Sequence, residues 1–159
     1  MIYYNIFTGG QGSGGTLSSV EMYQLGDSFT TTLPSLMNEA RGYHGCSLFT
    51  ANNGDFQLII TGGYNSNSGR LFSSVEISTK TGSGWSSFVK TDNALRGWRY
   101  SHTTTQIGQL LYTAGGQTSS SSTETSILVS DDGTTWTTST TSLTTGRRYH
   151  TAVATTDQC

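Results

Sequence analysis

The chain has 159 residues and a mass of 17.0 kDa, which suits a single domain with its own hydrophobic core. Only 11% of the residues are charged, and a net charge of −2 with a pI near 5.8 provides no basic surface for nucleic acid. No apolar run approaches the length of about 18 residues that a membrane span needs, and the first residues lack the segments of a signal peptide. The 20 glycines, the single proline and the many Ser and Thr residues predict strands joined by tight turns, and hence an all-β fold.

Three apolar runs that end in a double glycine recur at a regular interval. They are FTGG at 7–10, ITGG at 60–63 and YTAGG at 112–116. Gly62 lies 53 residues after Gly9 and 53 residues before Gly115. A fixed period near 50 residues is typical of repeat architectures, so we expect one region over 1–159 built from three similar units.

The first unit, about 1–40, is expected to hold three strands. Residues 2–8 form the first strand and 18–25 the second, with a glycine-rich exposed loop between them. Phe29 opens a short third strand.

The second unit, about 41–98, has four expected strands in antiparallel order. Asn53-Gly54 is a strong hairpin signal, because both residues adopt the backbone conformations of a tight turn. The expected strands are 45–50, 56–63, 73–78 and, opened by Trp85, 85–91.

The third unit, about 99–146, repeats this order, and 147–159 begins one strand more. Gly108 marks the first turn, and a polar loop follows the double glycine. The expected strands are 103–107, 109–116, 125–130 and, opened by Trp136, 136–140; the further strand is TAVATT at 151–156.

Two more motifs recur: SSVE at 18–21 and 73–76, and Arg-x-x-His at 41–44, 99–102 and 147–150. With the double glycine and the aromatic residue of the last strand, they make each unit resemble a kelch repeat. The resemblance implies that each unit is a four-stranded antiparallel blade of a β-propeller. The chain departs from the pattern at Leu128, which replaces the Glu of the VE pair, at Ala114 before the third double glycine, and at Phe29 in place of Trp.

The recurring motif residues are expected to have structural roles. Because the three histidines occupy equivalent positions on three units, symmetry separates them, and we expect each to pack and hydrogen-bond at the start of an inner strand. We find no set of residues for catalysis, a metal or a cofactor, and expect a protein that is not an enzyme. The structural set is Gly9, Gly10, Gly62, Gly63, Gly115, Gly116, Phe29, Trp85, Trp136, His44, His102 and His150.

The Arg-x-x-His motifs also suggest a binding surface. Their arginines precede the innermost strands, where loops surround the mouth of the ring, and aromatic residues lie nearby. Arginine and aromatic residues are enriched where proteins bind partners, and arginine can hold a carboxylate by two parallel bonds. The alternative is that each arginine pairs with a Glu of a neighbouring blade. The candidate rim comprises Arg41, Tyr43, Trp98, Arg99, Tyr100, Arg147 and Tyr149.

The order of strands suggests how the ring closes. The chain starts within the first unit's glycine-ended strand and stops after a strand that this unit lacks, so 147–159 is expected to supply a latch strand. Three blades are fewer than the four to eight of known propellers. The chain is therefore expected to be part of a longer propeller or half of a six-bladed ring made by two copies.

Two classes of function follow. The first is a non-catalytic scaffold that binds a partner protein or peptide, an acidic one by resemblance to kelch propellers, through the loop face of the blades. The second is part of a carbohydrate-binding or glycoside-processing propeller, since SDDGTTW at 130–136 is similar to the Asp-box turn of sialidase-like propellers, one residue short. A segment without activity of its own is the third possibility.

The two cysteines, Cys46 and Cys159, are not spaced as a metal or redox motif. Cys46 is expected to be a small buried residue on a strand. Cys159 could be free or paired. The few Lys and the many Ser and Thr residues favour an extracellular location, and the sequence leaves a cytoplasmic one open.

Overall fold

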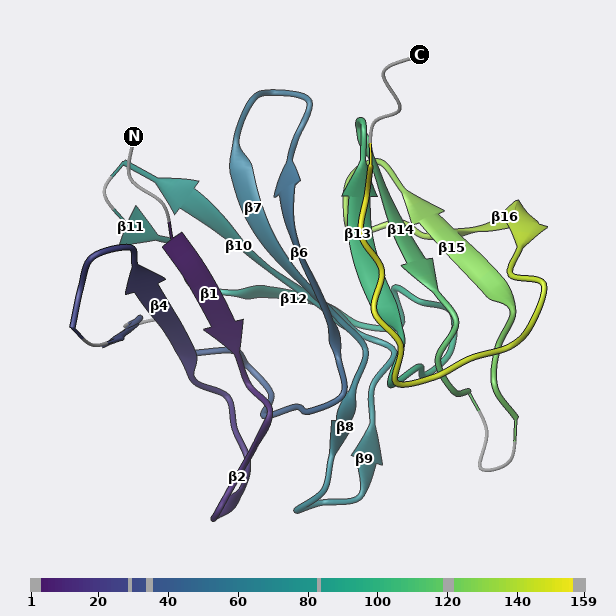
Figure 1. The fold of residues 1–159 in the computed structure, drawn as a ribbon, viewed down its shortest axis with the longest axis horizontal. Helices are drawn as coiled ribbons and strands as arrows, with labels where there is room; N and C mark the ends of the chain where they lie inside the picture. Colours follow the sequence, from purple (N-terminus) through teal and green to yellow (C-terminus); the bar gives the residue numbers. More distant parts are fainter. Residues whose placement is uncertain (1–3, 29, 34–35, 83, 119–121, 156–159) are drawn as a thin grey trace.

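The computed structural model describes residues 4–28, 30–33, 36–82, 84–118 and 122–155, and within them the fold is all-β. Three antiparallel sheets follow one another across the molecule in chain order (Figure 1). The described residues form no helix, and so none that could cross a membrane.

The first sheet has the order β1-β4-β5. Its strands are β1 (Tyr4–Thr8), β4 (Val20–Gln24) and β5 (Thr31–Thr32). The segment between β1 and β4, predicted as an open loop, contains the small hairpin of β2 (Gln11–Gly12) and β3 (Gly15–Thr16). Phe29, predicted to open the third strand, lies outside the described residues.

The second sheet has the order β6-β7-β10, with two short strands on the far side of β10. Its fourth strand is therefore not continuous as predicted, because residues 86–88 leave the sheet between two pairings with β10. Ala51–Asp55 turns the chain between the first two strands, with Gly54 at φ 88°. The strands are β6 (Gly45–Thr50), β7 (Phe56–Thr61), β10 (Val75–Thr81), β11 (Gly84–Trp85) and β12 (Val89–Thr91); β8 (Tyr64–Asn65) and β9 (Arg70–Leu71) form a separate hairpin.

The third sheet has the order β13-β14-β15-β16 and matches the predicted meander. Its strands are β13 (Thr103–Ile107), β14 (Leu110–Ala114), β15 (Ser126–Ser130) and β16 (Thr137–Ser142), so the buried Trp136 directly precedes the last strand.

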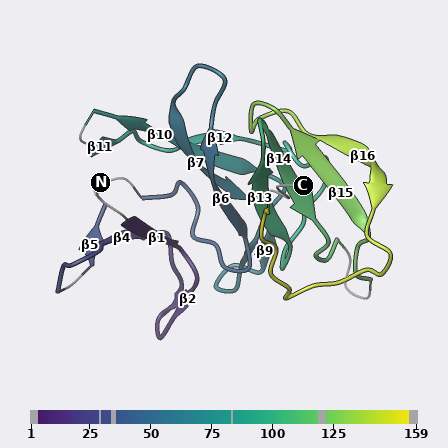
Figure 2. The same cartoon turned by 45° about the horizontal axis from the view of Figure 1, so that its top comes forward.

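The predicted latch strand is not formed in residues 151–155, which are exposed and unpaired in the described structure. These residues lie beside β13, where Ala152 and Val153 face Ile107 across a shallow pocket. The second sheet lies between these residues and the first sheet in both ribbon views (Figures 1 and 2). Within the described residues the segment therefore pairs with no strand of the first sheet, and no sheet closes.

The hydrophobic core consists of two clusters, one on each face of the second sheet. In β7 the side chains alternate, so that Leu58 and Ile60 join one cluster and Ile59 the other. A strand buried on both faces explains the unbroken apolar run LII. The first cluster holds Val20, Leu33, Met37, Leu58, Ile60 and Phe88, and the second holds Phe49, Ile59, Val75, Ala94, Leu95, Leu111, Leu128 and Trp136.

Candidate functional site

The double glycines join each sheet to the turn that leads into the next one. The N–H of Gly63 donates to the carbonyl of Arg99 (2.8 Å), and a Cβ on Gly62 would lie 2.2 Å from that carbonyl. Only a residue without a side chain fits there, and Gly62 also has φ +56°. We call each such contact, between a double glycine and the turn that contains the following Arg-x-x-His motif, a joint. The same bond forms in the other two joints, from the N–H of Gly10 to the carbonyl of Arg41 (3.0 Å) and from the N–H of Gly116 to that of Arg147 (2.7 Å).

The three histidines complete these joints. Nε2 of His44 shares a hydrogen bond with the hydroxyl of Thr8 (2.8 Å), and Nε2 of His102 with that of Thr61 (2.8 Å). Each of these threonines directly precedes a double glycine. Ala114 occupies the third such position, and His150 instead contacts the hydroxyl of Thr103 at 3.3 Å. His44 and His102 thus link consecutive sheets, and His150 links the third sheet to the segment that follows it.

Burial keeps these imidazoles neutral. Burial first, and the charge of Arg41 second, lower the pKa of His44 to about 4. Burial first, and the charge of Arg99 second, lower the pKa of His102 to about 3. Burial also lowers the pKa of His150. Among the described residues, no three His, Cys, Asp or Glu side chains are arranged to hold a metal ion.

Arg41 does not lie in an exposed rim, and that prediction is wrong. Its side chain is fully buried, and Nη2 donates to Glu76 Oε1 (2.5 Å) and to Glu39 Oε2 (3.2 Å). Nη1 donates to the carbonyl of Gly62 (2.8 Å). A buried charge needs such partners. Arg41 therefore contacts the first sheet through its backbone carbonyl and the second sheet through its side chain. Glu76 belongs to the same predicted unit, not to a neighbouring one.

Arg99 is also buried, with 5% of its surface exposed, so the prediction of an exposed arginine is wrong here too. It repeats the contacts of Arg41 with the next sheet, donating to the carbonyl of Gly115 (2.5 Å) and to Ser126 Oγ (2.7 Å). Arg147 is exposed, as the prediction requires, and Nε donates to the carbonyl of Thr145 (3.3 Å).

The residues that precede the three histidines, Tyr43, Ser101 and Tyr149, have left-handed backbone conformations, with φ of 54°, 56° and 57°. This region is unfavourable for large side chains. A chain of hydrogen bonds fixes the turns, from Ser101 N–H to the Tyr43 carbonyl (2.7 Å) and from Tyr149 N–H to the Ser101 carbonyl (3.1 Å). Tyr43 and Tyr149 are 46% and 65% exposed, and their rings meet edge to face at 6.0 Å.

A second aromatic group is partly buried and borders the same turns, since Gly42 bridges to Tyr64 and Tyr100 precedes Ser101. Trp98 stacks on Tyr100 with ring centroids 6.3 Å apart, and Tyr64 lies 6.2 Å from Tyr100 on the other side. The structure therefore brings together all four predicted aromatic residues in two groups. The prediction missed Tyr64 and also Arg148, whose guanidinium lies 5.3 Å from the ring centre of Tyr149. Tyr64 follows Gly63 directly, so its place beside the next turn could have been inferred from the repeat.

The SDDGTTW segment forms a tightly bonded turn. Asp132 Oδ1 accepts from the N–H groups of Thr134 and Thr135, both at 2.7 Å, and Trp136 Nε1 donates to the carbonyl of Gly133 (3.0 Å). Burial acts to raise the pKa of Asp132, but these hydrogen bonds and those from the Thr134 and Ser130 hydroxyls outweigh it and lower the pKa to about 2. These contacts are all within the turn, so they account for its sequence without a ligand.

Cys46 lies on β6 but is exposed, contrary to the prediction. In this edge strand Gly45 and Phe49 face inward, and the alternation turns Cys46 and Leu48 outward. Cys159 lies outside the described residues.

Comparison with known proteins gives a likeness of fold only. No family model matches the chain, and no curated protein matches it. A solved structure of YjhT is similar to this chain with a TM-score of 0.62 at 13% sequence identity, over 85% of this chain and 48% of that one. The chain therefore spans about half the length of YjhT. At this identity the match supports a shared all-β fold and carries no activity or ligand across.

Proposed function

We propose that the chain is a non-catalytic scaffold that binds a partner protein or peptide through the surface formed by Tyr43, Tyr149, Trp98, Tyr100 and Tyr64. The observation that carries the proposal is the pair Tyr43 and Tyr149, two exposed aromatic residues held in left-handed conformations by backbone bonds from neighbouring turns. Strained residues cluster at functional sites, and rigid tyrosines are preferred contact residues in interfaces.

We also propose that the three sheets are kelch-type blades of a β-propeller. Three features support this: each sheet is an antiparallel meander, equivalent joints connect successive sheets, and the second sheet is buried on both faces. The first sheet exposes Phe7 and the third exposes Ile107, each about half, as outer faces that further blades would cover. We predict that either a longer chain or a second copy of this chain supplies the remaining blades of the ring.

The test of binding starts from random peptides displayed on phage. The affinity of the best selected peptide is then measured on single-residue variants. Tyr43→Ala and Tyr149→Ala are expected to weaken binding about tenfold or more, as anchors at the centre of an interface do. Tyr4→Ala is the matched control, because Tyr4 is also 46% exposed but lies on β1.

An equal affinity for all three variants, with unchanged urea denaturation, would remove the tyrosine surface as the binding site. Failure to select any peptide would oppose a peptide partner. The second candidate, a carbohydrate-binding propeller, has in its favour the stacked Trp98 and Tyr100 rings and the resemblance of SDDGTTW to an Asp box. A glycan array separates the two candidates, since a scaffold for peptides gives no signal on it.

A further inference from the structure

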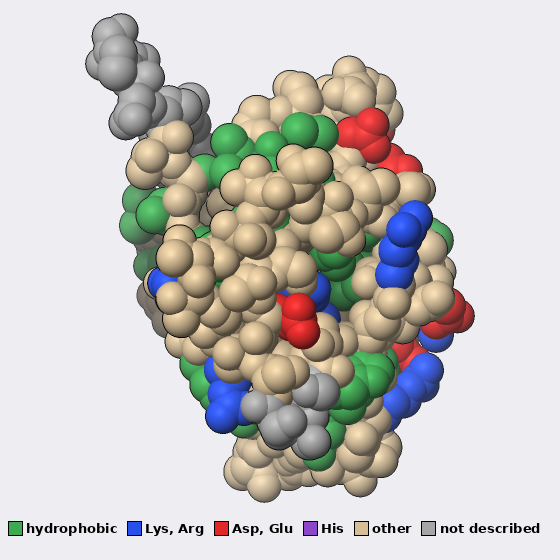
Figure 3. Space-filling model, turned by 90° about the vertical axis from the view of Figure 1, so that its right-hand side faces the viewer, with side chains coloured by type: hydrophobic (Ala, Val, Ile, Leu, Met, Phe, Trp, Pro, Cys, Tyr) green, Lys and Arg blue, Asp and Glu red, His purple; other side chains and the backbone are tan. Residues whose placement is uncertain are grey.

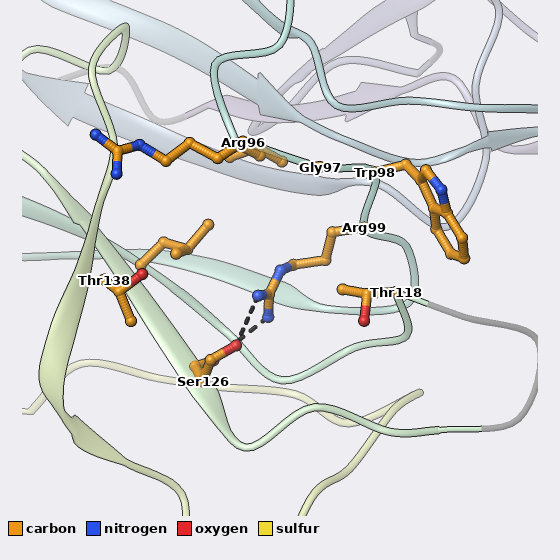
Figure 4. A pocket seen from close by; sticks show the side chains of 9 residues that line it. Arg96, Gly97, Trp98, Arg99, Thr118, Ser126 and Thr138 are labelled. Atoms are coloured by element: carbon orange, nitrogen blue, oxygen red, sulfur yellow. Dashed lines mark hydrogen bonds between the residues drawn. The ribbon is translucent and has the colours of Figure 1, made fainter.

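Arg99 lines a pocket that is separate from the exposed tyrosine pair. The pocket has a volume of about 290 Å³ and lies between the loop that follows β12 and strands β15 and β16. Figure 4 shows Arg99 pointing into it toward Ser126, with Arg96 extending along another wall toward Thr138. From the β16 side, the surface of the molecule has a hollow near its middle in which basic and hydrophobic atoms are visible, with an acidic side chain beside them (Figure 3).

The guanidinium of Arg99 has donors to spare. Nη1 donates to the carbonyls of Gly115 and Ser126, at 2.5 and 3.3 Å, and Nη2 donates to Ser126 Oγ at 2.7 Å. An arginine has five N–H donors. The Nε–H and one Nη2–H therefore have no acceptor among the described residues. The Nε of Arg41 has no partner either, so the free Nη2–H is the donor of Arg99 that lacks a carboxylate found at the equivalent arginine.

Arg41, the equivalent arginine at the preceding joint, has partners that Arg99 lacks. Arg41 donates to the same backbone and serine positions of its own next sheet, Gly62 and Ser74, but it also contacts the carboxylates of Glu39 and Glu76. The carboxylate of Glu76 is fixed further by the N–H and the side-chain amide of Asn38, at 2.5 and 3.0 Å.

Around Arg99 each of these three positions has a different residue. Gly97 precedes Arg99 by two residues, as Glu39 precedes Arg41, and Arg96 corresponds to Asn38. Leu128 corresponds to Glu76, because Leu128 pairs with Thr113 in the third sheet as Glu76 pairs with Ile60 in the second. Arg96, Gly97 and Leu128 all line the pocket, so the pocket opens where the second sheet has its two carboxylates.

The surrounding charge favours an anion. Arg96 is exposed and makes no ion pair with a described residue, so it adds positive charge at the edge of the pocket. Glu124 is the one carboxylate that acts to raise the pKa of Arg99, against the larger effect of burial, which lowers it. Glu124 accepts a hydrogen bond from Ser126 (3.1 Å) and makes no direct ion pair with Arg99.

We propose that this pocket binds one carboxylate group of a ligand at Nη2 of Arg99, as the carboxylate of Glu76 contacts Nη2 of Arg41 at the preceding joint. The inference deepens the proposed function and rests on it for the source of the carboxylate, an Asp or Glu side chain of the bound peptide. A sugar acid offers the same group and is the other source.

The experiment follows the Arg99 Nε–H resonance of the intact chain by NMR. Four probes are titrated: the blocked tripeptides Gly-Glu-Gly and Gly-Gln-Gly, and glucuronate and glucose. We expect the Glu tripeptide to bind at least tenfold more tightly than the Gln tripeptide and to shift this resonance. Equal effects of acid and neutral probes, or no shift with either acid, would overturn the proposal.

The variant Leu128→Glu supplies the missing carboxylate from within. It is expected to lower the affinity for the acidic probe at least tenfold, whereas Leu128→Gln, of equal size and without charge, stays within about threefold of the original chain. Unchanged acid binding in Leu128→Glu would contradict the proposal. If either variant fails to fold, the titration of the unaltered chain still tests whether the pocket binds a carboxylate.

The outcomes also separate this inference from the proposed function. Binding of glucuronate without the Glu tripeptide supports the pocket and assigns it to a sugar acid, which removes the peptide as its source. Peptide binding that depends on Tyr43 and Tyr149 but is equal for Glu and Gln probes overturns the carboxylate pocket and leaves the scaffold standing.

Discussion

Gly62 allows two sheets to approach closely because it has no side chain. The carbonyl of Arg99 occupies the position of its Cβ, and the adjoining N–H of Gly63 bonds to that carbonyl. Gly69 has a similar backbone, with φ +71° compared with +56°, but no atom lies within 4 Å of its Cβ position. Replacing Gly69 by Ala therefore costs stability through backbone strain alone, whereas the same change at Gly62 adds a steric clash.

We expect Gly62→Ala to destabilise the chain by roughly 3 kcal/mol or more, since a rigid backbone contact must move as well as φ. Gly69→Ala is expected to cost only about 1 kcal/mol, from the left-handed conformation alone. Urea denaturation of both variants measures the difference. Equal losses of stability would mean that the contact with Arg99 adds nothing.

At this scale the spacing of the sequence predicted the motif residues but not their surroundings. The Gly-Gly and Arg-x-x-His intervals identify equivalent positions, yet Arg41 and Arg99 proved to be buried. Their burial depends on Gly62, Ser74, Gly115 and Ser126 from the following sheet, which are 21 to 33 residues away for Arg41. Contacts at such separations are fixed by packing, and a periodic pattern alone does not contain them.

Strands β4 and β10 carry the same SSVE motif with different consequences. Glu76 on β10 is fully buried and accepts from Arg41, from Asn38 and from the N–H of Glu39 at 3.2 Å. Glu21 on β4 is partly exposed and accepts from the hydroxyl of Thr30 at 2.8 Å. The difference arises because a joint arginine precedes the second sheet.

Glu76→Gln is expected to cost about 3 kcal/mol or more, because it leaves the buried guanidinium of Arg41 with only the partly exposed Glu39 as a counter-charge. Glu21→Gln, at the equivalent position, is expected to change stability by less than about 0.5 kcal/mol. Thermal and urea unfolding of the two variants provide the comparison. A loss of similar size in both would show that the ion pair with Arg41 is not what stabilises this joint.

The sequence predicted the long strands well and the short elements poorly. Alternating or unbroken apolar runs define β6, β7 and β14, because side chains of these strands enter the two core clusters. The hairpins β2–β3 and β8–β9 are rich in Gly, Ser and Asn and have no hydrophobic period. They are fixed by contacts with one another, such as Gln11 Nε2 to Ser66 Oγ at 2.8 Å.

At the scale of the whole molecule, the joints between sheets share one titratable feature. His44 connects the first sheet to the second, and His102 connects the second to the third. Both have pKa values far below the ordinary value of 6.5, at about 4 and about 3. Protonation of either imidazole would place a charge in a buried joint next to Arg41 or Arg99. Acid should therefore act on the contacts between sheets before it acts on the strands within them.

The sign of the pH dependence follows from these values. Below pH 6.5 the unfolded chain binds protons that the folded chain does not, so the free energy of unfolding falls as the pH falls toward 4. Each of the two histidines contributes a slope that approaches about 1.4 kcal/mol per pH unit. Asp132 does not affect this slope. Its pKa is about 2 in the folded chain and 3.8 ordinarily, so it changes the free energy of unfolding only as the pH falls below 3.8.

We therefore expect the urea midpoint to decrease steadily between pH 6.5 and pH 5, while strand content in the folded chain stays constant. Because the pKa of His150 is lowered too, His102→Gln removes one of three contributing protons and should reduce the slope by about a third to a half in this range, whatever its effect on stability at pH 7. Its comparison with the unaltered chain needs only urea titrations at three pH values. A slope that His102→Gln leaves unchanged would mean that groups outside the second joint cause the acid sensitivity.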